Sequence, residues 1–262
     1  MRQTDLRLNG RVIRNGALVL LLAAIIFTHT GCTFHIYGGP RFGTYKNASS
    51  YKTGEFDYEA KDVKEVEVNW IDADITVKQS NAGTLHVSET DTGLKKGQKM
   101  HWLVDGDKLI VQYCESGYKG KKFPAGSKKL SIEIPEDVDL QISGVSAEVT
   151  LEGSQVLQNL KVDTVSGEVK AEDVTLSGKA DIDSVSGDAT LGLADCDKAE
   201  LNSVSGDFHL TELPAGGATI KYDTVSGSVH AADYTMNDKE YVFGGGDCKI
   251  SVETVSGDLS VE

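Results

Sequence analysis

A short motif, Thr/Ser-Val-Ser-Gly, places a serine hydroxyl near acidic residues at five positions in the chain. The motif serines are Ser166, Ser186, Ser205, Ser226 and Ser256. A serine near a carboxylate could act as a nucleophile if a general base activated it. A catalytic group is needed once, however, whereas this motif recurs at successive spacings of 20, 19, 21 and 30 residues. The recurrence indicates a structural role, and we expect no catalytic residues.

Two columns of mostly acidic residues flank the motif and could bind Ca²⁺. The column three positions before the serine is Asp163, Asp183, Asn202, Asp223 and Glu253. The column two positions after it is Glu168, Asp188, Asp207, Ser228 and Asp258. Carboxylates stacked about 5 Å apart repel one another, and Ca²⁺ would relieve that repulsion with oxygen ligands. Because the calcium-binding β-roll nonapeptide is absent, we favour a hydrated outward face, with no metal and no cofactor.

The cysteines and histidines offer little metal chemistry. Cys114, Cys196 and Cys248 are an odd number of thiols, so at least one cannot form an intramolecular disulfide. If the repeats stack in sequence order, Cys196 and Cys248 lie two turns apart, about 10 Å, which exceeds disulfide reach unless an insertion folds back. We therefore favour buried single thiols. His209 and His230 share one phase of the repeat and could stack, but they show no ligand spacing with the cysteines.

The first 31 residues have the pattern of a signal peptide that ends at a lipid-attachment cysteine. Arginines precede an apolar run of 11 residues, Ala17 to Phe27, which is short of the about 20 residues that span a bilayer. Thr30-Gly31-Cys32 then resembles a bacterial lipobox, although His29 stands where an aliphatic residue is usual. We expect lipid attachment at Cys32 and an extracytoplasmic location. A secretory signal cleaved nearby, or an uncleaved anchor, remains an alternative.

Charge and arginine content exclude several partners. The formal net charge is −14, and Arg41 is the only arginine after the signal-like segment. An acidic chain repels nucleic acid and anionic lipid headgroups. Bidentate recognition of phosphate usually needs arginine, so we expect no phosphate ligand. The membrane contact that we predict is the lipid anchor alone, followed by a Gly/Ser/Thr/Tyr-rich tether over 32–56.

The repeat itself predicts the architecture that positions these residues. Apolar and small residues alternate with polar ones on both sides of each motif, as in β-strands, and the parity changes within Val-Ser-Gly, which predicts a corner. A period of about 20 residues with two short strands is one turn of a solenoid. We expect an all-β, single-stranded parallel β-solenoid (β-helix), right-handed by the general preference of parallel crossovers. Glycine would give the corners conformational freedom at Gly167, Gly187, Gly206, Gly227 and Gly257.

The regularity of the repeat divides the mature chain. Residues 57–135 carry fainter alternation and a basic loop, 117–129, which we interpret as irregular early turns with an exposed insertion. Residues 136–262 carry the regular repeats, interrupted by a second insertion over 234–248. The early part could instead form a small separate β-domain.

Together these motifs resemble those of the bacterial "putative adhesin" family of β-solenoid domains. The resemblance rests on the Thr/Ser-Val-Ser-Gly-Asp/Glu repeats, on the strand that contains Pro135 (IEIPEDVDL) and on the lipoprotein-type start, and it covers roughly 60–262. It implies an adhesin-like role without transferable catalytic or ligand residues. Some relatives are tethered accessories of envelope-stress systems, which implies a second role.

We therefore expect a non-catalytic, surface-tethered lipoprotein that binds a protein or glycan partner along its repeats. One alternative is a membrane-anchored accessory that contacts an envelope-stress sensor. The other is a polysaccharide-acting enzyme on a β-helix, which would need a localised acid/base cluster that breaks the repeat. A localised function should lie where the repeat fails: the basic loop near Lys121, the 234–248 insertion or the early turns.

Overall fold

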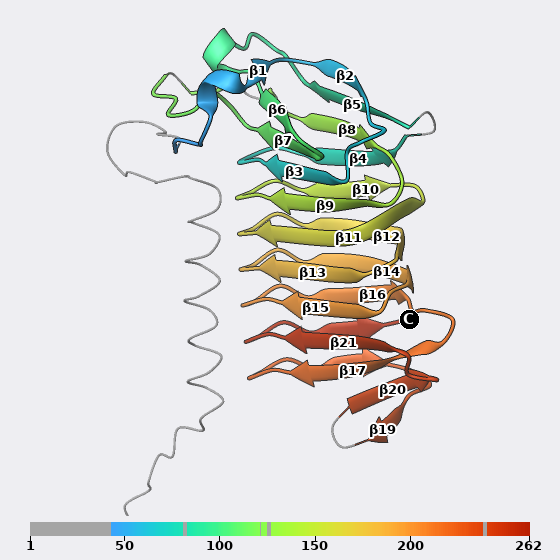
Figure 1. Ribbon diagram of the computed structural model, residues 1–262. Helices are drawn as coiled ribbons and strands as arrows, with labels where there is room; N and C mark the ends of the chain where they lie inside the picture. The colour runs from blue at the N-terminus through green and yellow to red at the C-terminus, as the bar shows by residue number, and fades with distance from the viewer. Residues whose placement is uncertain (1–42, 81–82, 121, 125–126, 238–239) are drawn as a thin grey trace, which may run out of the picture.

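The computed structural model describes residues 43–80, 83–120, 122–124, 127–237 and 240–262, and in these the fold is all-β, as predicted. The strands form two layers that lie face to face with the apolar core between them (Figure 1). Two short 3₁₀ helices, η1 (Ala48–Ser50) and η2 (Lys96–Gln98), lie near the start of the described chain. None of the described helices is long and apolar enough to cross a membrane.

The layer nearer the viewer in Figure 1 is called the front sheet. Each of its strands hydrogen-bonds to the next in the following order: β1 (Lys52–Thr53), β6 (His101–Asp105), β7 (Lys108–Gln112), β3 (Glu65–Asn69), β9 (Val138–Ser143), β11 (Gln155–Thr164), β13 (Lys179–Ser184), β15 (Lys198–Asn202), β21 (Cys248–Glu253), β17 (Gly217–Asp223), β20 (Glu240–Gly244) and β19 (Thr235–Asn237).

The other layer is called the back sheet, and the pairing of β11 with β12 joins it to the front sheet. The order of its strands is β2 (Phe56–Glu59), β5 (Thr84–Glu89), β8 (Leu130–Ile134), β4 (Ile75–Gln79), β10 (Val149–Glu152), β12 (Val169–Leu176), β14 (Ala189–Asp195), β16 (Phe208–Glu212), β22 (Leu259–Val261) and β18 (Val229–Ala231).

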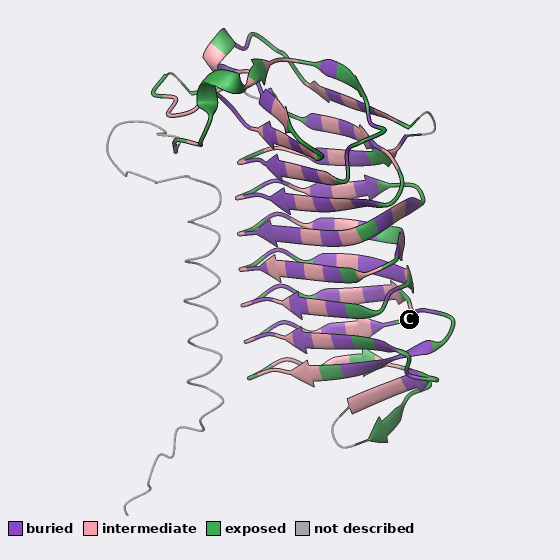
Figure 2. Cartoon of the chain, in the orientation of Figure 1, coloured by how far each residue is buried: buried purple, intermediate pink, exposed green. Residues whose placement is uncertain are grey.

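A rung consists of one front strand and the back strand that follows it in the chain. In the central rungs the register between neighbours is offset by 20 residues, so that Val162 pairs with Ile182 and Val169 with Ala189. Both of these columns are buried, because every second residue of a strand faces the core. Figure 2 shows this alternation as bands of buried and less buried residues on successive rungs. The alternating sequence thus forms a ladder of apolar side chains along the core.

The rungs do not stack in sequence order at either end of the molecule, which corrects the sequential coil that we expected. The first rung of the chain, β3 with β4, lies between β7/β8 and β9/β10. The last rung of the chain, β21 with β22, lies between β15/β16 and β17/β18. The outermost rung is therefore the second rung of the chain, β7 with β8, at one end, and the second to last, β17 with β18, at the other. A constant period fixes the phase of each rung but leaves the order of stacking open.

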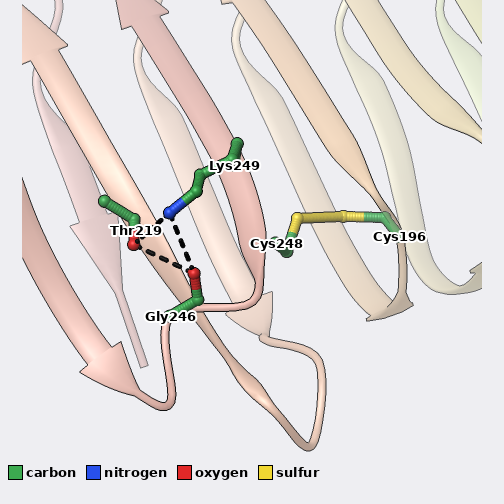
Figure 3. The surroundings of a disulfide bond; sticks show 5 residues. All are labelled: Cys196, Thr219, Gly246, Cys248 and Lys249. Atoms are coloured by element: carbon green, nitrogen blue, oxygen red, sulfur yellow. Dashed lines mark hydrogen bonds between the residues drawn. A yellow bond between two sulfur atoms is a disulfide. The ribbon is translucent and has the colours of Figure 1, made fainter.

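This insertion brings Cys196 and Cys248 together. The two cysteines form a disulfide with a Cα–Cα distance of 6.0 Å (Figure 3), so our prediction that both are single thiols was wrong. The prediction assumed that the two cysteines lie two turns apart, whereas β21 pairs directly with β15. On the other side of the inserted rung, Lys249 Nζ donates to Thr219 Oγ1 at 3.0 Å and to the Gly246 carbonyl at 3.2 Å. Cys114 is buried and lies outside this disulfide.

The strands of 57–135 and 136–262 pair directly with each other, β3 with β9 and β4 with β10. The division of the chain at residue 135 stays a prediction about sequence regularity, and so does the handedness of the coil. The predicted signal segment, Cys32 and most of the tether lie outside the described residues.

Candidate functional site

The repeated motif forms the corners between front and back strands, and its polar atoms are engaged in the backbone there. The Gly167 amide donates to Thr164 Oγ1 at 3.1 Å, and the equivalent bond forms at each later corner, which explains why Thr or Ser opens the motif. The Ser186 amide donates to the Val165 carbonyl of the preceding rung at 2.9 Å. The motif serines thus hold successive corners together.

The corner glycines are needed for space. A Cβ at Gly187 would lie 2.0 Å from the Gly167 carbonyl oxygen, and the same clash with the neighbouring rung occurs at Gly167, Gly206, Gly227 and Gly257. None of the five has a positive φ. We expected glycine to supply conformational freedom, whereas the structure requires it for the close approach of stacked backbones.

The acidic column that follows the serine is half-buried to exposed and binds backbone amides. Asp188 Oδ1 accepts from the Asp207 amide at 2.8 Å, Asp207 Oδ1 from the Asp258 amide at 2.7 Å, and Asp258 Oδ1 from the Ser228 amide at 2.7 Å. Each carboxylate therefore links one rung to the next. These bonds give the column a structural role without a metal ion.

The acidic column that precedes the serine is partly buried, which differs from the hydrated face that we predicted. Asp163 is 2% exposed, and Lys161 Nζ lies 3.1 Å from its Oδ1, 3.5 Å from Asp181 Oδ2 and 3.6 Å from Asp183 Oδ2. Burial raises the pKa of Asp183 above its usual range, although Asn202 donates a hydrogen bond to it. The lysine therefore offsets part of the negative charge of carboxylates that the sequence pattern suggested were solvated. Within the described ranges, no group of three or more His, Cys, Asp or Glu side chains could hold a metal ion.

A buried lysine lies at the base of the predicted basic loop. Lys128 is fully buried and forms an ion pair with Glu89, and its Nζ lies 4.7 Å from the ring centroids of both Trp70 and Tyr113. Its Nζ also donates to the Gln98 carbonyl at 3.0 Å. Burial lowers the pKa of Lys128, while the carboxylate of Glu89 opposes that shift. Our expectation that the whole loop is exposed was wrong at this residue, and no sequence signal marked its aromatic surroundings.

A shallow cleft of about 350 Å³ near η1 offers a second candidate site, lined in part by Lys52, Tyr58 and Trp102. Exposed aromatic faces are typical of sugar-binding sites. Here Phe56 stacks on the indole of Trp102 at a centroid distance of 3.7 Å, and the Lys52 ammonium lies 4.8 Å from the indole centroid. Trp102 is 8% exposed, so its ring is already covered by this chain's own side chains.

The two ends of the stack differ in how they are covered. At the capped end, β6 and β1 extend the front sheet beyond β7, and β5 and β2 extend the back sheet beyond β8. At the other end, β20 and β19 extend the front sheet beyond β17. In the described part of the chain, no strand extends the back sheet beyond β18. We call this the stepped end, because its front sheet is two strands longer than its back sheet.

Exposed apolar side chains gather at the stepped end. The described large hydrophobic residues that are exposed are Val225 (50%), Tyr234 (40%) and Met236 (56%) at this end, and Tyr58 (38%) on β2 at the capped end. All three residues of β19 are exposed (Figure 2), and Tyr234 packs on the hairpin with its ring 5.0 Å from that of Tyr241. The 234–248 insertion, which we singled out as a break in the repeat, therefore forms most of this surface.

The back strand of the terminal rung, β18, is less buried than the back strands inside the stack. Val229 and Ala231 on β18 are half-buried, whereas Val169 and Ala171 in the same columns are each 1% exposed. Their register partners are Leu259 and Val261, which are buried. On the side of the stepped end, β18 is the strand that covers these two residues. The stepped end thus leaves the core columns incompletely covered, as in a solenoid that lacks a terminal cap.

The histidine pair does not form as the sequence phase suggested. Ser260 lies between His209 and His230, because β22 is inserted between β16 and β18. His209 Nδ1 contacts the Ser260 hydroxyl instead. The two imidazoles are therefore on separate rungs with a serine between them.

The described chain enters the stack at the capped end, opposite the stepped end. The Gly43 carbonyl accepts from the Gly117 amide at 2.9 Å, and the Tyr45 amide donates to Ser116 Oγ at 3.0 Å. Strand β1 then pairs with β6 (Figure 1). The long axis of the stack separates this entry point from the exposed apolar surface by eight rungs, about 38 Å at about 4.8 Å a rung.

Comparison with known proteins identifies the family of this domain. A search of curated proteins finds no match. Among solved structures, a "putative cell adhesion protein" from Clostridium sporogenes is similar, with 13% identity and a TM-score of 0.42 over 80% of this chain and 98% of that chain. A "putative adhesin" from Bacteroides fragilis is similar with 17% identity and a TM-score of 0.39 over 80% and 97%. The model of the Toastrack family, DUF4097, matches residues 63–262, and the chain therefore belongs to this family.

Proposed function

We propose that this protein is a non-catalytic, membrane-tethered binding module that presents its stepped end to a macromolecular partner. The observation that carries the proposal is the concentration of exposed apolar side chains at Val225, Tyr234 and Met236, beside the partly covered core columns of β18. Exposed apolar groups at one place on a soluble surface are typical of interaction sites. The proposal adopts the adhesin-like role that we expected from the sequence.

The geometry suits a tethered module. If Cys32 carries a lipid, the 11 residues from there to Gly43 reach at most about 40 Å and join the stack at its capped end. Entry at the capped end leaves the stepped end at the far end of the stack from the point of attachment. Hydrogen-bonded rungs make the stack a stiff spacer between the two.

The polar groups that recur along the stack support a binding role over catalysis. The hydroxyl of the Thr or Ser that opens the motif accepts from the corner glycine amide, and the hydroxyl of the motif serine donates to a carbonyl of the neighbouring rung. The exposed carboxylates accept from amides of the next rung. A general acid or base needs an available carboxyl group near a substrate. We therefore propose that the partner is bound through the stepped end and is released unchanged.

Vesicles that carry the full-length lipidated protein provide a direct test. They would be passed over a panel of immobilised envelope polysaccharides and surface proteins, with retention and release of soluble sugar measured together. The decisive variant is Met236→Ser at the stepped end, and the matched control is Tyr58→Ser, an exposed apolar residue at the capped end. We expect Met236→Ser to lower retention at least tenfold, Tyr58→Ser to leave it unchanged, and no sugar to be released.

Two outcomes would contradict the proposal. Equal retention of both variants would show that the stepped end does not bind. Release of sugar fragments that depends on the protein would show catalysis. Mass spectrometry of Cys32 tests the tether separately, and an unacylated Cys32 with cleavage elsewhere would remove the lipid anchor.

A further inference from the structure

We infer that the partner of the stepped end is a second copy of this chain, bound through a two-fold axis that runs along the strands. This inference rests on the proposed function and names its partner. In the pairing, the β19–β20 hairpin of each copy fills the missing part of the other copy's back sheet.

The size of the step makes the end self-complementary. In the described residues, the front sheet exceeds the back sheet at this end by two strands, β20 and β19, and both belong to one hairpin. A two-fold axis along the strand direction exchanges front and back sheets between copies. The two extra strands of one copy then occupy the two missing positions beyond β18 of the other, and the reverse holds at the same time. Such an isologous contact closes on itself and gives a dimer.

The directions of the edge strands also match. Front and back strands of a rung run in opposite directions (Figure 1). Strand β20 is antiparallel to β17 and β19 is antiparallel to β20, so β19 runs with the front strands and opposite to β18. The axis along the strands preserves these directions. Consequently β18 of one copy meets β19 of the other as an antiparallel pair, which is the pairing that short edge strands form most readily.

Backbone groups are available on the outer edge of β18. The Ser228 carbonyl accepts from the Leu259 amide at 2.9 Å, and β18 pairs in parallel with β22. In a parallel ladder alternate residues bond to opposite sides. The N–H and C=O groups of Val229 and Ala231 therefore point away from β22, toward the position that β19 of a second copy would take. Addition of a strand to such an edge is a common mode of recognition.

The exposed side chains fit the same contact. Met236 is the central residue of β19, and Val225 precedes β18 at the last corner. Their exposed fractions, 56% and 50%, are the two largest of any described large hydrophobic residue. Reciprocal pairing would cover Met236 in each of the two copies. The contact is small, so we expect weak association that is strengthened by many copies on one surface.

Charge distinguishes self-pairing from binding to a basic partner. The chain has a formal net charge of −14, so two copies repel each other at low ionic strength. Added salt screens this repulsion and should strengthen self-pairing. Binding to a cationic protein would weaken under the same change. The direction of the salt effect therefore separates the two kinds of partner.

The arrangement also predicts what the pairing connects. The chain entry points lie at the capped ends, so they lie at opposite ends of the dimer, with two stacks of about 38 Å each between them. A tether of at most about 40 Å on each side suits anchorage in two facing membranes. The pair would thus act as a homophilic adhesin between two surfaces.

Cross-linking of two variants tests the pairing directly. His230→Cys on β18 and Thr235→Cys on β19, both on the outward face of their sheets, would be prepared separately as full chains in detergent, each with a different tag, and treated with a cross-linker of about 8 Å, which tolerates a diagonal register. We expect a covalent dimer that carries both tags only in the mixture. Each variant alone should give little product, because like positions lie in different sheets of the dimer. Equal cross-linking of each variant alone, or none in the mixture, would overturn the two-fold pairing.

Sedimentation of the full chain provides an independent test. Ala231→Pro removes an outward N–H of β18 without touching the bonds to β22, and we expect it to weaken self-association at least tenfold while the melting temperature is unchanged. Thr190→Pro, a change in the paired strand β14 of the stack interior, should instead lower the melting temperature. A monomeric wild type at every salt concentration would refute self-pairing. If the wild type were monomeric but Met236→Ser still abolished vesicle retention on another surface, the proposed function would survive. If the wild type were monomeric and Met236→Ser left retention unchanged, both the proposed function and the inference of self-pairing would fail.

Discussion

The two ends of the stack cover the apolar core in different ways. Both end rungs lie out of sequence order, with an inserted rung one step inward. At the capped end, four antiparallel strands and a buried Lys128–Glu89 pair close both sheets. At the stepped end, one hairpin closes the front sheet and leaves the edge of β18 without a further strand in the described residues.

This difference predicts that the capped end contributes mainly to stability and the stepped end mainly to binding. A solenoid needs its terminal core columns covered, and the capped end achieves this with its own chain. At the stepped end, a disulfide and the Lys249 hydrogen bonds hold the inserted rung on both sides. We therefore expect substitutions at the capped end to change the free energy of unfolding, and substitutions at the stepped end to change binding.

The largest expected effect is at the capped end. Glu89→Gln leaves the Lys128 ammonium buried without its carboxylate, which should lower the free energy of unfolding by about 3–5 kcal/mol. Chemical denaturation measures this. The double variant Glu89→Gln/Lys128→Met should recover a large part of the loss, since it removes the buried charge as well. A loss below about 1 kcal/mol would mean that the pair behaves like an exposed salt bridge.

The disulfide should have the next largest effect. Cys196 and Cys248 are separated by 52 residues, and Cys196→Ser/Cys248→Ser should lower the free energy of unfolding by about 2–4 kcal/mol. Hydrogen exchange should show the loss of protection concentrated in β21 and β17. Reduction of the wild type should reproduce the effect. Uniform destabilisation that includes β3 and β7 would contradict the idea that the disulfide secures the stepped end alone.

The sequence predicted the regular part of this comparison and missed the ends. Alternation and the recurring motif were enough to predict an all-β stack with corners at Gly167 and its equivalents. They could not predict that β21 lies beside β15, because every rung has the same phase and fits beside any other. The disulfide follows from that order, so it was missed as well. Lys128 was missed because its aromatic partners Trp70 and Tyr113 directly follow β3 and β7, away from Lys128 in the sequence.

A smaller effect should depend on pH. Burial lowers the pKa of His101 below its ordinary value of 6.5, so the unfolded chain binds this proton more readily than the folded chain. The contribution of neutral His101 to the free energy of unfolding is therefore present above pH 6.5 and is lost as the pH falls toward the lowered pKa. The melting temperature should fall between about pH 7.5 and about pH 5.5, and less so in His101→Gln. The same fall in both proteins would exclude a contribution from His101.

The smallest expected effect on stability is at the stepped end. Met236→Ser changes a residue that is 56% exposed, and the free energy of unfolding should change by no more than about 0.5 kcal/mol. Thermal unfolding measures this beside the retention assay described above. A loss of more than about 2 kcal/mol would show that Met236 belongs to the core of the hairpin, and the separation of stability from binding would fail.

Hydrogen exchange of the full chain at low and high protein concentration tests the central claim most directly. Self-pairing predicts that exchange slows with concentration in peptides that contain β18 and β19, with no change in peptides that contain β2 at the capped end. Val229 and Ala231 should account for the slower exchange in β18, because their amides point outward. Exchange that is independent of concentration at β18, or that slows equally at β2, would contradict the assignment of the stepped end as the interaction surface.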